Sequence, residues 1–386
     1  MQQEERISSI GIAVLILCGV TPFMRIVIGG SGILSLVLIP ALVLFAYNFK
    51  KFRFLSGLKV KIILISLWLM FSTIYSPVQT SLSLENSKVQ ICTIMIFLYY
   101  LNKKEEKILT ILAFAAAAVF IYSYFFSSDF YMAGIRKRIL WQGTTWLDPN
   151  MVIASFIVPA IVGVKLFIEK KGILWKIGIV LFWGLSLYCA FLGSSRGGLI
   201  AIVIGAILYL VLELKPSAKT IFPAIGAVIV LIIAFNVVRS YIPENLLQRM
   251  TLASVSETGG SGRLDIYSEY IERFFSESNI FRLLFGYGKE ACKLYLGKSA
   301  HNILIDYLWD LGITGLIFHL VVIFSLIKYC IKSKSVLSIS CLVAVIIWSL
   351  GISTSDQLLY WVLLYTCVVY ATNNSIAITN KSGRTA

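Results

Sequence analysis

Long stretches of apolar residues, separated by short polar segments, recur along almost the whole chain of 386 residues. An α-helix needs about 20 such residues to cross the hydrocarbon core of a bilayer. Because lipid offers the backbone no hydrogen-bond partners, these stretches must be helices rather than open strands. The pattern predicts about twelve transmembrane helices, over residues 7–24, 26–47, 60–77, 88–101, 107–127, 150–168, 173–193, 197–214, 220–238, 302–329, 335–352 and 357–373.

Composition agrees with this pattern. Hydrophobic residues make up 58% of the chain and charged residues 14%, whereas soluble domains carry about 25% charged residues. We therefore expect an all-α polytopic membrane protein that forms a single membrane domain over residues 1–386. Nothing along the chain alternates in segments of about 10 residues, which argues against a membrane β-barrel.

The net charge of +15 is unevenly distributed. Lysines gather in every second polar segment, and the positive-inside rule places those segments in the cytoplasm together with both chain ends. The basic excess then lies almost entirely inside, so it reflects topology, and no nucleic-acid partner is expected. Two long segments fall outside the membrane: residues 128–149, and a loop over residues 239–300.

Part of the longer outer loop has the pattern of an amphipathic helix. After the glycine-rich residues 259–262, apolar positions follow helical spacing from Arg263 to Phe275. Such a helix is suited to lie along the membrane interface as a lid over a site. A helix that only covers the bundle fits the pattern equally well, so both interpretations stay open.

Arginine is unusually frequent among the basic residues on the outer side, although the positive-inside rule predicts few basic residues there. The guanidinium group binds phosphate oxygens in a bidentate manner and keeps its charge. An anionic group, with a lipid-linked phosphate as the natural candidate, is therefore expected on this side. The outer basic residues include Arg136, Lys137, Arg138, Arg196, Arg239, Arg249, Arg263, Arg273 and Arg282.

Arg196 stands in the sequence Ser-Ser-Arg-Gly-Gly (194–198), between two apolar stretches with almost no loop. A charge so close to hydrocarbon is costly and favours a functional role. The following helix also directs its N-terminus, which attracts anions, toward the same place. The alternative is an arginine that extends its side chain to the interface without a function.

His301 is one of only two histidines, and it stands just before a predicted helix. A neutral imidazole can accept a proton from a hydroxyl group at neutral pH. Asn302 and Asp306, four residues apart, share one face of that helix. Capping of the helix by His301 is the structural alternative. The second histidine, His319, is expected to be packed or to face a pore near the cytoplasmic side.

The chain shows no motif for a metal or a nucleotide. It contains no Asp-x-Asp, His-x-x-x-His or Glu-x-x-His sequence and no glycine-rich phosphate loop. Its seven cysteines form no Cys-x-x-Cys pair or Cys/His cluster, so buried structural thiols are expected. We therefore expect neither a metal nor a cofactor, and fixed arginine charge remains to stabilise an anion.

Four motifs together resemble a known family. They are Asp-Pro-Asn (148–150), Ser-Ser-Arg-Gly-Gly (194–198), Gly-Arg-Leu-Asp-Ile-Tyr (262–267) and the stretch from Ala300 to Gly315 that begins Ala-His-Asn. In this order, on a frame of membrane helices and with a large loop before the His-Asn helix, they resemble the bacterial O-antigen ligase/polymerase (Wzy/WaaL-like) family. The resemblance implies a GT-C-like fold with one long extracytoplasmic loop.

The resemblance also implies an activity: a metal-independent glycosyltransferase in the bacterial cytoplasmic membrane, with its active site outside. The donor would be a glycan on undecaprenyl pyrophosphate. Arg196 and Arg263 match arginines that hold the pyrophosphate, and His301 matches the residue that activates the acceptor hydroxyl, with inversion at the anomeric carbon. We assign substrate binding also to four further residues: Asn302, Arg136, Asp148 and Asn150.

Several functions remain open within this framework. A polymerase of lipid-linked repeat units of O-antigen, capsular or exopolysaccharide is favoured, because no added domain follows the last predicted helix. A ligase that transfers the glycan to a lipid A core or a protein is the alternative. A flippase or another transporter is the second alternative, although no internal repeat of the kind common in transporters is visible. A flippase and a chain-length regulator are possible partners.

Overall fold

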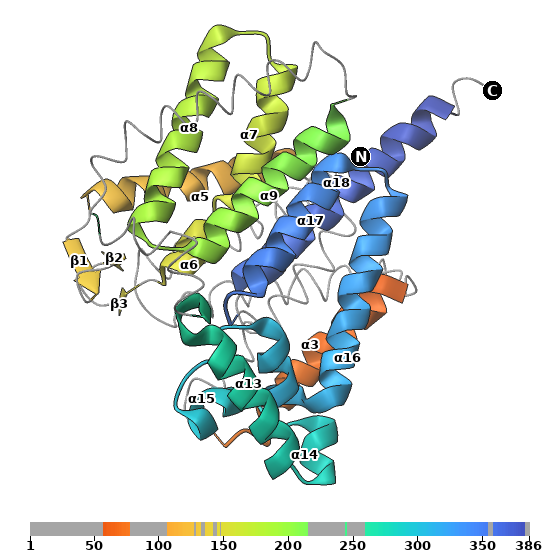
Figure 1. Cartoon of the computed structure of the whole chain (residues 1–386). Helices are drawn as coiled ribbons and strands as arrows, with labels where there is room; N and C mark the ends of the chain where they lie inside the picture. The colour runs from red at the N-terminus through yellow and green to blue at the C-terminus, as the bar shows by residue number, and fades with distance from the viewer. Residues whose placement is uncertain are drawn as a thin grey trace, which may run out of the picture. The chain divides into compact units, whose positions relative to one another are not determined.

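The computed structural model describes residues 57–77, 106–126, 129–132, 136–141, 145–146, 148–214, 244, 259–353 and 358–382. The helices predicted at 7–24, 26–47, 88–101 and 220–238 lie outside these residues. The described elements, labelled in Figure 1, are α3 (Gly57–Phe71), α5 (Glu106–Phe126), β1 (Asp129–Met132), β2 (Arg136–Trp141), β3 (Thr145–Trp146), α6 (Pro149–Ala154), α7 (Ile157–Glu169), α8 (Ile173–Leu192), α9 (Arg196–Glu213), α13 (Gly259–Glu277), α14 (Ile280–Phe285), α15 (Ala291–Leu296), α16 (Ile303–Lys332), α17 (Val336–Ser349) and α18 (Leu358–Ser382).

Helices form at the apolar stretches, as predicted. Five described segments are long and apolar enough to cross a membrane, namely Leu109–Phe126, Pro149–Glu169, Ile173–Leu192, Arg196–Glu213 and Ile303–Lys332. These segments support a multi-pass membrane protein, because their apolar side chains and internally bonded backbones suit hydrocarbon. The total of about twelve helices stays a prediction.

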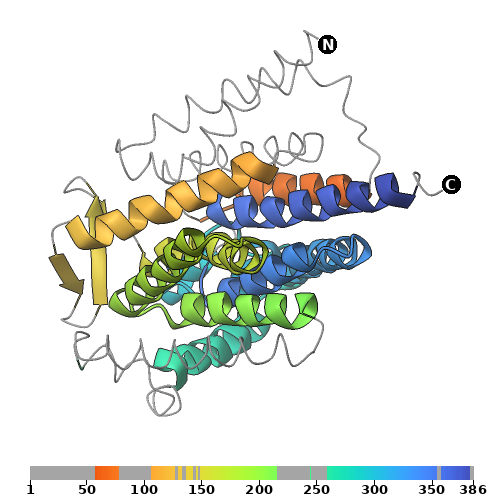
Figure 2. The ribbon, with the colours of Figure 1, turned by 90° about the horizontal axis from the view of Figure 1, so that it is seen from above.

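The outer segment predicted at 128–149 contains a small antiparallel sheet of three strands in the order β1-β2-β3. Asp129 pairs with Ile139 and Met132 with Arg136, and Trp141 pairs with Thr145 in the next strand. The expectation of an all-α protein was wrong for this segment. Aromatic and branched residues joined by short connections favour strand pairing over a helix. Figure 2 shows β1 and β2 beyond the end of α5.

The chain divides into two compact units. The first comprises Met1–Leu112, Gly262–Ser338 and Ser349–Ala386, and the second comprises Ala113–Ser261 and Ile339–Trp348. In the second unit, α7 packs against both α8 and α9, and the short helix α6 contacts α8 and α9. These helices build the surroundings of Arg196.

The apolar segment that was predicted as one helix at 150–168 is divided into α6 and α7. At the division, the amides of Ser155 and Phe156 bond the carbonyls of Val152 and Ile153, three residues back, at 3.1 and 3.0 Å. This tighter turn keeps the backbone groups hydrogen-bonded at the division between the two helices. Gly198 in α9 lies so close to α6 that an added Cβ would approach Ile153 Cγ2 to 2.6 Å. Only glycine allows this contact.

In the first unit, α16 contacts α3, α14, α15 and α18. Its helix is interrupted at Gly312, which has φ +72° and ψ −173°. That backbone conformation is open to glycine and strained for other residues. The carbonyls of Trp309 and Asp310 accept the amides of Tyr287 and Gly288 at 2.8 and 3.1 Å. The segment after α14 therefore replaces the bonds that the interrupted helix lacks.

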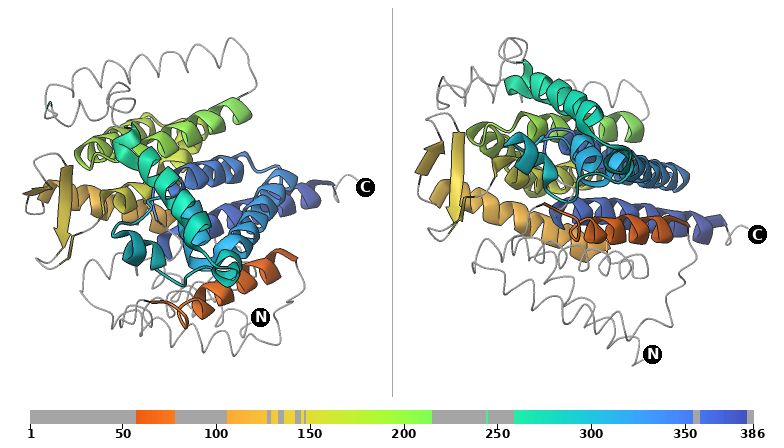
Figure 3. Two further views of the ribbon diagram at one scale, coloured as in Figure 1. Left: turned by 60° about the horizontal axis from the view of Figure 1, so that its bottom comes forward. Right: turned by 90° about the horizontal axis from the view of Figure 1, so that it is seen from below.

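A cluster of buried side chains joins the first turns of α16 to α13 and α15. It is centred on Trp309 and includes Tyr270, Phe274 and Tyr287. The Trp309 ring centroid lies 5.0 Å from that of Tyr287 and 5.6 Å from that of Phe274. Figure 3 shows α14 and α15 gathered beside α16. This cluster fixes α13 against the N-terminal end of α16, where His301 stands.

Candidate active site

Helix α13 confirms that the segment from Arg263 to Phe275 is helical, but its apolar residues lie on both a packed side and an exposed side. Tyr270 and Phe274 are buried in the cluster around Trp309, whereas Leu264, Ile271 and Phe275 are exposed. One side therefore packs inside the first unit, and the other presents apolar surface. A lid and a structural cover both stay predictions.

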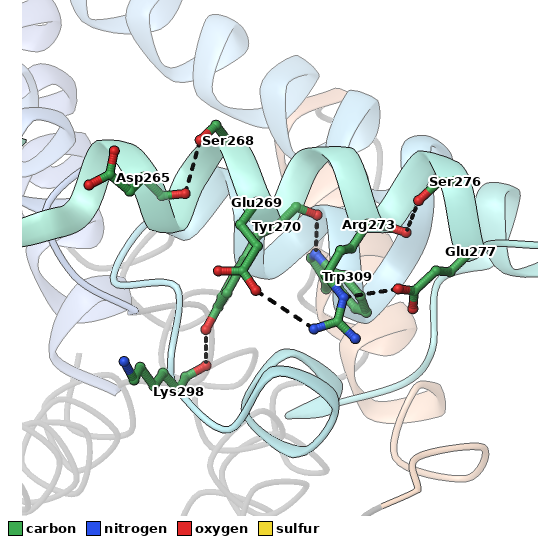
Figure 4. A network of polar contacts seen from close by, with 9 residues as sticks. All are labelled: Asp265, Ser268, Glu269, Tyr270, Arg273, Ser276, Glu277, Lys298 and Trp309. Atoms are coloured by element: carbon green, nitrogen blue, oxygen red, sulfur yellow. Dashed lines mark hydrogen bonds and ion pairs between the residues drawn. The ribbon is translucent and has the colours of Figure 1, made fainter.

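Polar contacts anchor α13 along its length (Figure 4). The Trp309 Nε1 donates to the Tyr270 carbonyl at 3.1 Å, and the Tyr270 hydroxyl donates to the Lys298 carbonyl at 2.8 Å. Arg273 pairs with Glu269 at 3.7 Å and with Glu277 at 2.9 Å, both on its own helix. These carboxylates neutralise Arg273, so it is a poor candidate for holding an anionic ligand.

Arg263 lies near the N-terminal end of the same helix and differs from Arg273. Among the described residues, none forms an ion pair with Arg263 within 4.0 Å, and its side chain is only partly buried. Its charge acts on Tyr267, one helical turn further along α13. Burial raises the pKa of the Tyr267 hydroxyl, while the Arg263 charge and the Asn302 side chain oppose that rise. Arg263, Tyr267 and Asn302 are therefore neighbours.

His301 lies in a turn held from two directions. Its backbone has φ +53°, which is rare for a residue other than glycine. The His301 amide donates to the Ser353 hydroxyl at 3.1 Å, and the Tyr267 hydroxyl donates to the His301 carbonyl at 3.1 Å. The structure thus brings together Arg263, His301 and Asn302 from α13 and the start of α16.

Asn302 caps α16. Its backbone is extended, with φ −151° and ψ 121°, and its side-chain oxygen accepts the Leu304 amide at 2.9 Å. The Asp306 amide bonds the Asn302 carbonyl at 3.0 Å, which begins the helix. Asparagine is among the best residues for this position. Capping by His301, the structural alternative for that residue, was wrong, because the neighbouring Asn302 performs it.

The turn that carries Arg196 belongs to the second unit. Ser194 has φ +51°, and Ser195 precedes α9 without capping it through its side chain. The Ser195 hydroxyl instead donates to the Asn150 side-chain oxygen at 2.8 Å. Arg196 is the first residue of α9 and is partly buried. Its guanidinium group therefore starts from a helix N-terminus, where anions are favoured.

Two other predicted binding residues, Asp148 and Asn150, support this turn. The Asp148 carboxylate accepts the Asn150 amide at 2.8 Å and caps α6. The Asn150 side chain is buried, and its backbone carbonyl accepts the Trp348 Nε1 at 3.0 Å. Both residues hold α6 beside the Arg196 turn. Arg136 begins β2, opposite Met132 in β1. Their predicted contacts with substrate stay predictions.

Three charged residues of the first unit are buried. Sequence analysis placed Asp306 on one helix face with Asn302 but missed Lys289 and Asp310. Lys289 is 3% exposed, Asp306 6% and Asp310 5%. Buried charges need compensation by partners. The spacing of Asp306 and Asp310, four residues apart in an apolar helix, was the available signal.

Cys292, which falls within the outer loop predicted at 239–300, is buried near this group, as expected for a structural thiol. Burial and the charges of Asp306 and Asp310 raise the pKa of its thiol far above the ordinary value, so the thiol stays protonated. His319 is also buried, and its ring stacks on Tyr307 with centroids 4.0 Å apart. The expectation that this histidine is packed is confirmed. No group of three metal-binding side chains occurs within the described ranges.

Part of the chain is similar to a known protein family. Residues 180–320 match the family model described as O-antigen ligase, which confirms the resemblance seen in the motifs. The match includes Arg196, Arg263, His301 and Asn302, and excludes Arg136, Asp148 and Asn150. A search of curated proteins found no significant match.

Proposed function

We propose that this chain, which matches the O-antigen ligase family model at residues 180–320, is a metal-independent membrane glycosyltransferase that polymerises oligosaccharide repeat units linked to undecaprenyl pyrophosphate. The reaction takes place on the outer face of the bacterial cytoplasmic membrane. The family match and the apolar helices support the broader statement, a membrane enzyme of O-antigen or other polysaccharide biosynthesis.

One observation carries the assignment of roles. The Tyr267 hydroxyl bonds the His301 carbonyl at 3.1 Å, and Arg263 stands four residues before Tyr267 on the same helix face. An always-charged guanidinium group and an imidazole therefore come from adjoining segments. This pairing suits a reaction in which an anionic leaving group departs while a hydroxyl group loses its proton.

The proposed step breaks the bond between the anomeric carbon of the donor glycan and its pyrophosphate oxygen. The acceptor hydroxyl oxygen forms the new bond from the opposite side, which inverts the configuration. His301 takes the acceptor proton, and undecaprenyl pyrophosphate leaves with the electron pair. Arg263 and Arg196 bind the pyrophosphate and stabilise its growing charge, the role that a metal ion plays in many other transferases.

Ligation is the second candidate, because the family model that matches is described as O-antigen ligase. In that reaction the donor and the two arginines keep their roles, and only the acceptor changes to a lipid A core or a protein. The same match disfavours simple transport, since a transporter forms no glycosidic bond.

The test is an incubation of the purified full chain in lipid with an undecaprenyl-pyrophosphate-linked repeat unit and a chelator. A ladder of longer glycans supports polymerisation without metal. Product only after addition of a lipid A core identifies a ligase instead. A strict requirement for a divalent metal contradicts the proposed mechanism, and the absence of any covalent product contradicts both transferase assignments.

A further inference from the structure

His301 has a backbone conformation that its own residue type does not favour. Its φ of +53° lies in the left-handed region, which residues other than glycine rarely occupy. The surroundings must therefore hold it there. Two side chains bond its backbone: Ser353 accepts from the amide, and Tyr267 donates to the carbonyl, both at 3.1 Å. The direction of the imidazole depends on this backbone.

The two bonds come from different parts of the first unit. Tyr267 belongs to α13, whereas Ser353 follows α17. The Tyr267 hydroxyl also lies 3.5 Å from the carbonyl of Leu350, in the same connection as Ser353. The Tyr267 hydroxyl therefore lies close both to the His301 turn and to the connection after α17, whose Ser353 bonds the His301 amide.

Tyr267 also connects this turn to Arg263. The two residues are four positions apart on α13, so their side chains share a face, and the Arg263 charge acts on the Tyr267 phenol. Burial raises the pKa of that phenol, so the hydroxyl keeps its proton at neutral pH and remains a donor. The Tyr267 side chain is partly buried.

We propose that Tyr267 and Ser353 are positioning residues: together they fix the backbone of His301, and Tyr267 also sets the distance between His301 and Arg263. The proposal rests on the proposed transferase function for its kinetic consequence, but the structural part is independent of it. Neither residue exchanges a proton with substrate. Their effect on the reaction passes through the imidazole, because a misplacement of about 1 Å costs a reaction roughly 100-fold.

The chain offers a matched control. Tyr270 lies on the same helix and donates through its hydroxyl to a backbone carbonyl, that of Lys298, at 2.8 Å. It is 2% exposed and belongs to the core cluster, so loss of its hydroxyl should disturb stability at least as much as at Tyr267. Tyr270 does not bond His301. A purely structural role therefore predicts that Tyr270→Phe is the more harmful change.

The experiment compares Tyr267→Phe, Tyr270→Phe, Ser353→Ala and Ser353→Thr in the full chain in lipid. We expect Tyr267→Phe and Ser353→Ala to lower kcat about 10- to 100-fold, with less than a threefold change in the KM of the lipid-linked donor. Ser353→Thr, which keeps the hydroxyl, should recover most of kcat, and Tyr270→Phe should change kcat less than twofold. Equal losses of kcat in the two tyrosine variants overturn the proposal.

A second measurement does not depend on turnover. Hydrogen exchange at the His301 amide should be about tenfold faster in Ser353→Ala and in Tyr267→Phe than in the native chain, because the turn loses a constraint. Tyr270→Phe should leave it unchanged. If hydrogen exchange at the His301 amide is the same in Ser353→Ala and Tyr267→Phe as in the native chain, the positioning role is overturned, even if the chain is an active transferase. Faster exchange in a chain that forms no glycan product supports positioning and rejects the proposed function.

Discussion

Two turns, one in each unit, share a residue in the left-handed backbone conformation but differ in how the following helix begins. Ser194 has φ +51° and precedes Ser195 and α9, while His301 has φ +53° and precedes Asn302 and α16. Each turn thus places a left-handed residue just before a helix. Asn302 caps its helix through its side chain, whereas the Ser195 hydroxyl bonds Asn150 and leaves α9 without a side-chain cap.

The presence or absence of a side-chain cap suits the two turns to different roles. The first amides of an uncapped helix favour an anion, and Arg196 adds a full positive charge at the same end. The start of α16 has its cap from the protein itself, so the turn is suited to hold an imidazole in place rather than to bind an anion. The comparison favours phosphate binding at the Arg196 turn and proton transfer at the His301 turn, in line with the roles that we propose for these residues and for Arg263.

Removal of the imidazole should have the largest effect. His301→Ala is expected to lower the rate of glycosidic-bond formation about 10³-fold, because a general base contributes on that order. The donor should still bind, since both arginines remain. Rate and donor binding are measured separately on chain reconstituted in lipid. Retention of more than half of the native rate rejects the assigned role.

Changes at the Arg196 turn should be smaller and should appear in donor binding as well as in rate. Arg196→Lys keeps the charge but loses the bidentate geometry, and we expect about a 100-fold lower kcat/KM for the lipid-linked donor. The control is Arg273→Lys, because Arg273 pairs with carboxylates of its own helix. If both lysine variants behave alike, Arg196 has no specific role.

The Ser195 hydroxyl should stabilise the fold through its bond to Asn150, because it does not cap α9. Ser195→Ala leaves the buried side-chain oxygen of Asn150 without this donor, which costs about 1–3 kcal/mol. Thermal unfolding in detergent measures the loss, and Ser195→Thr should largely restore stability. A stability change near zero in Ser195→Ala indicates that water replaces the bond, and the turn is then less tightly held than proposed.

The smallest expected change concerns the cap of α16. Asn302→Ala should lower stability by about 1 kcal/mol, the usual cost of losing a side-chain cap, and Asn302→Asp should retain it. The rate should fall in parallel if the cap also orients His301. Asn302→Asp with native stability but much lower activity would point instead to a direct substrate contact of the amide.

Much of the fold was accessible from sequence because hydrophobic stretches and their lengths constrain membrane helices strongly. The predicted helix at 197–214 agrees within one residue with Arg196–Glu213, and that at 107–127 with Glu106–Phe126. The Ser-Ser-Arg-Gly-Gly and Ala-His-Asn motifs also identified the two turns correctly as helix starts. Local composition was sufficient for these features.

Other features depend on contacts between distant residues, which hydropathy does not report. The break at Gly312 is stabilised by Tyr287 and Gly288, more than 20 residues earlier in the chain. Ser353 gives no sequence signal for its bond to the His301 amide. The sheet at 129–146 was missed because its strands are short and its charged residues resembled an ordinary loop.

The most direct test of the account is a balance measurement on the reaction itself. Purified chain in lipid is supplied with a labelled undecaprenyl-pyrophosphate-linked repeat unit, and released undecaprenyl pyrophosphate is counted together with new glycosidic bonds. The account predicts equal amounts of the two products from the native chain and almost none from His301→Ala. Movement of the labelled lipid across the membrane with neither product formed would contradict it.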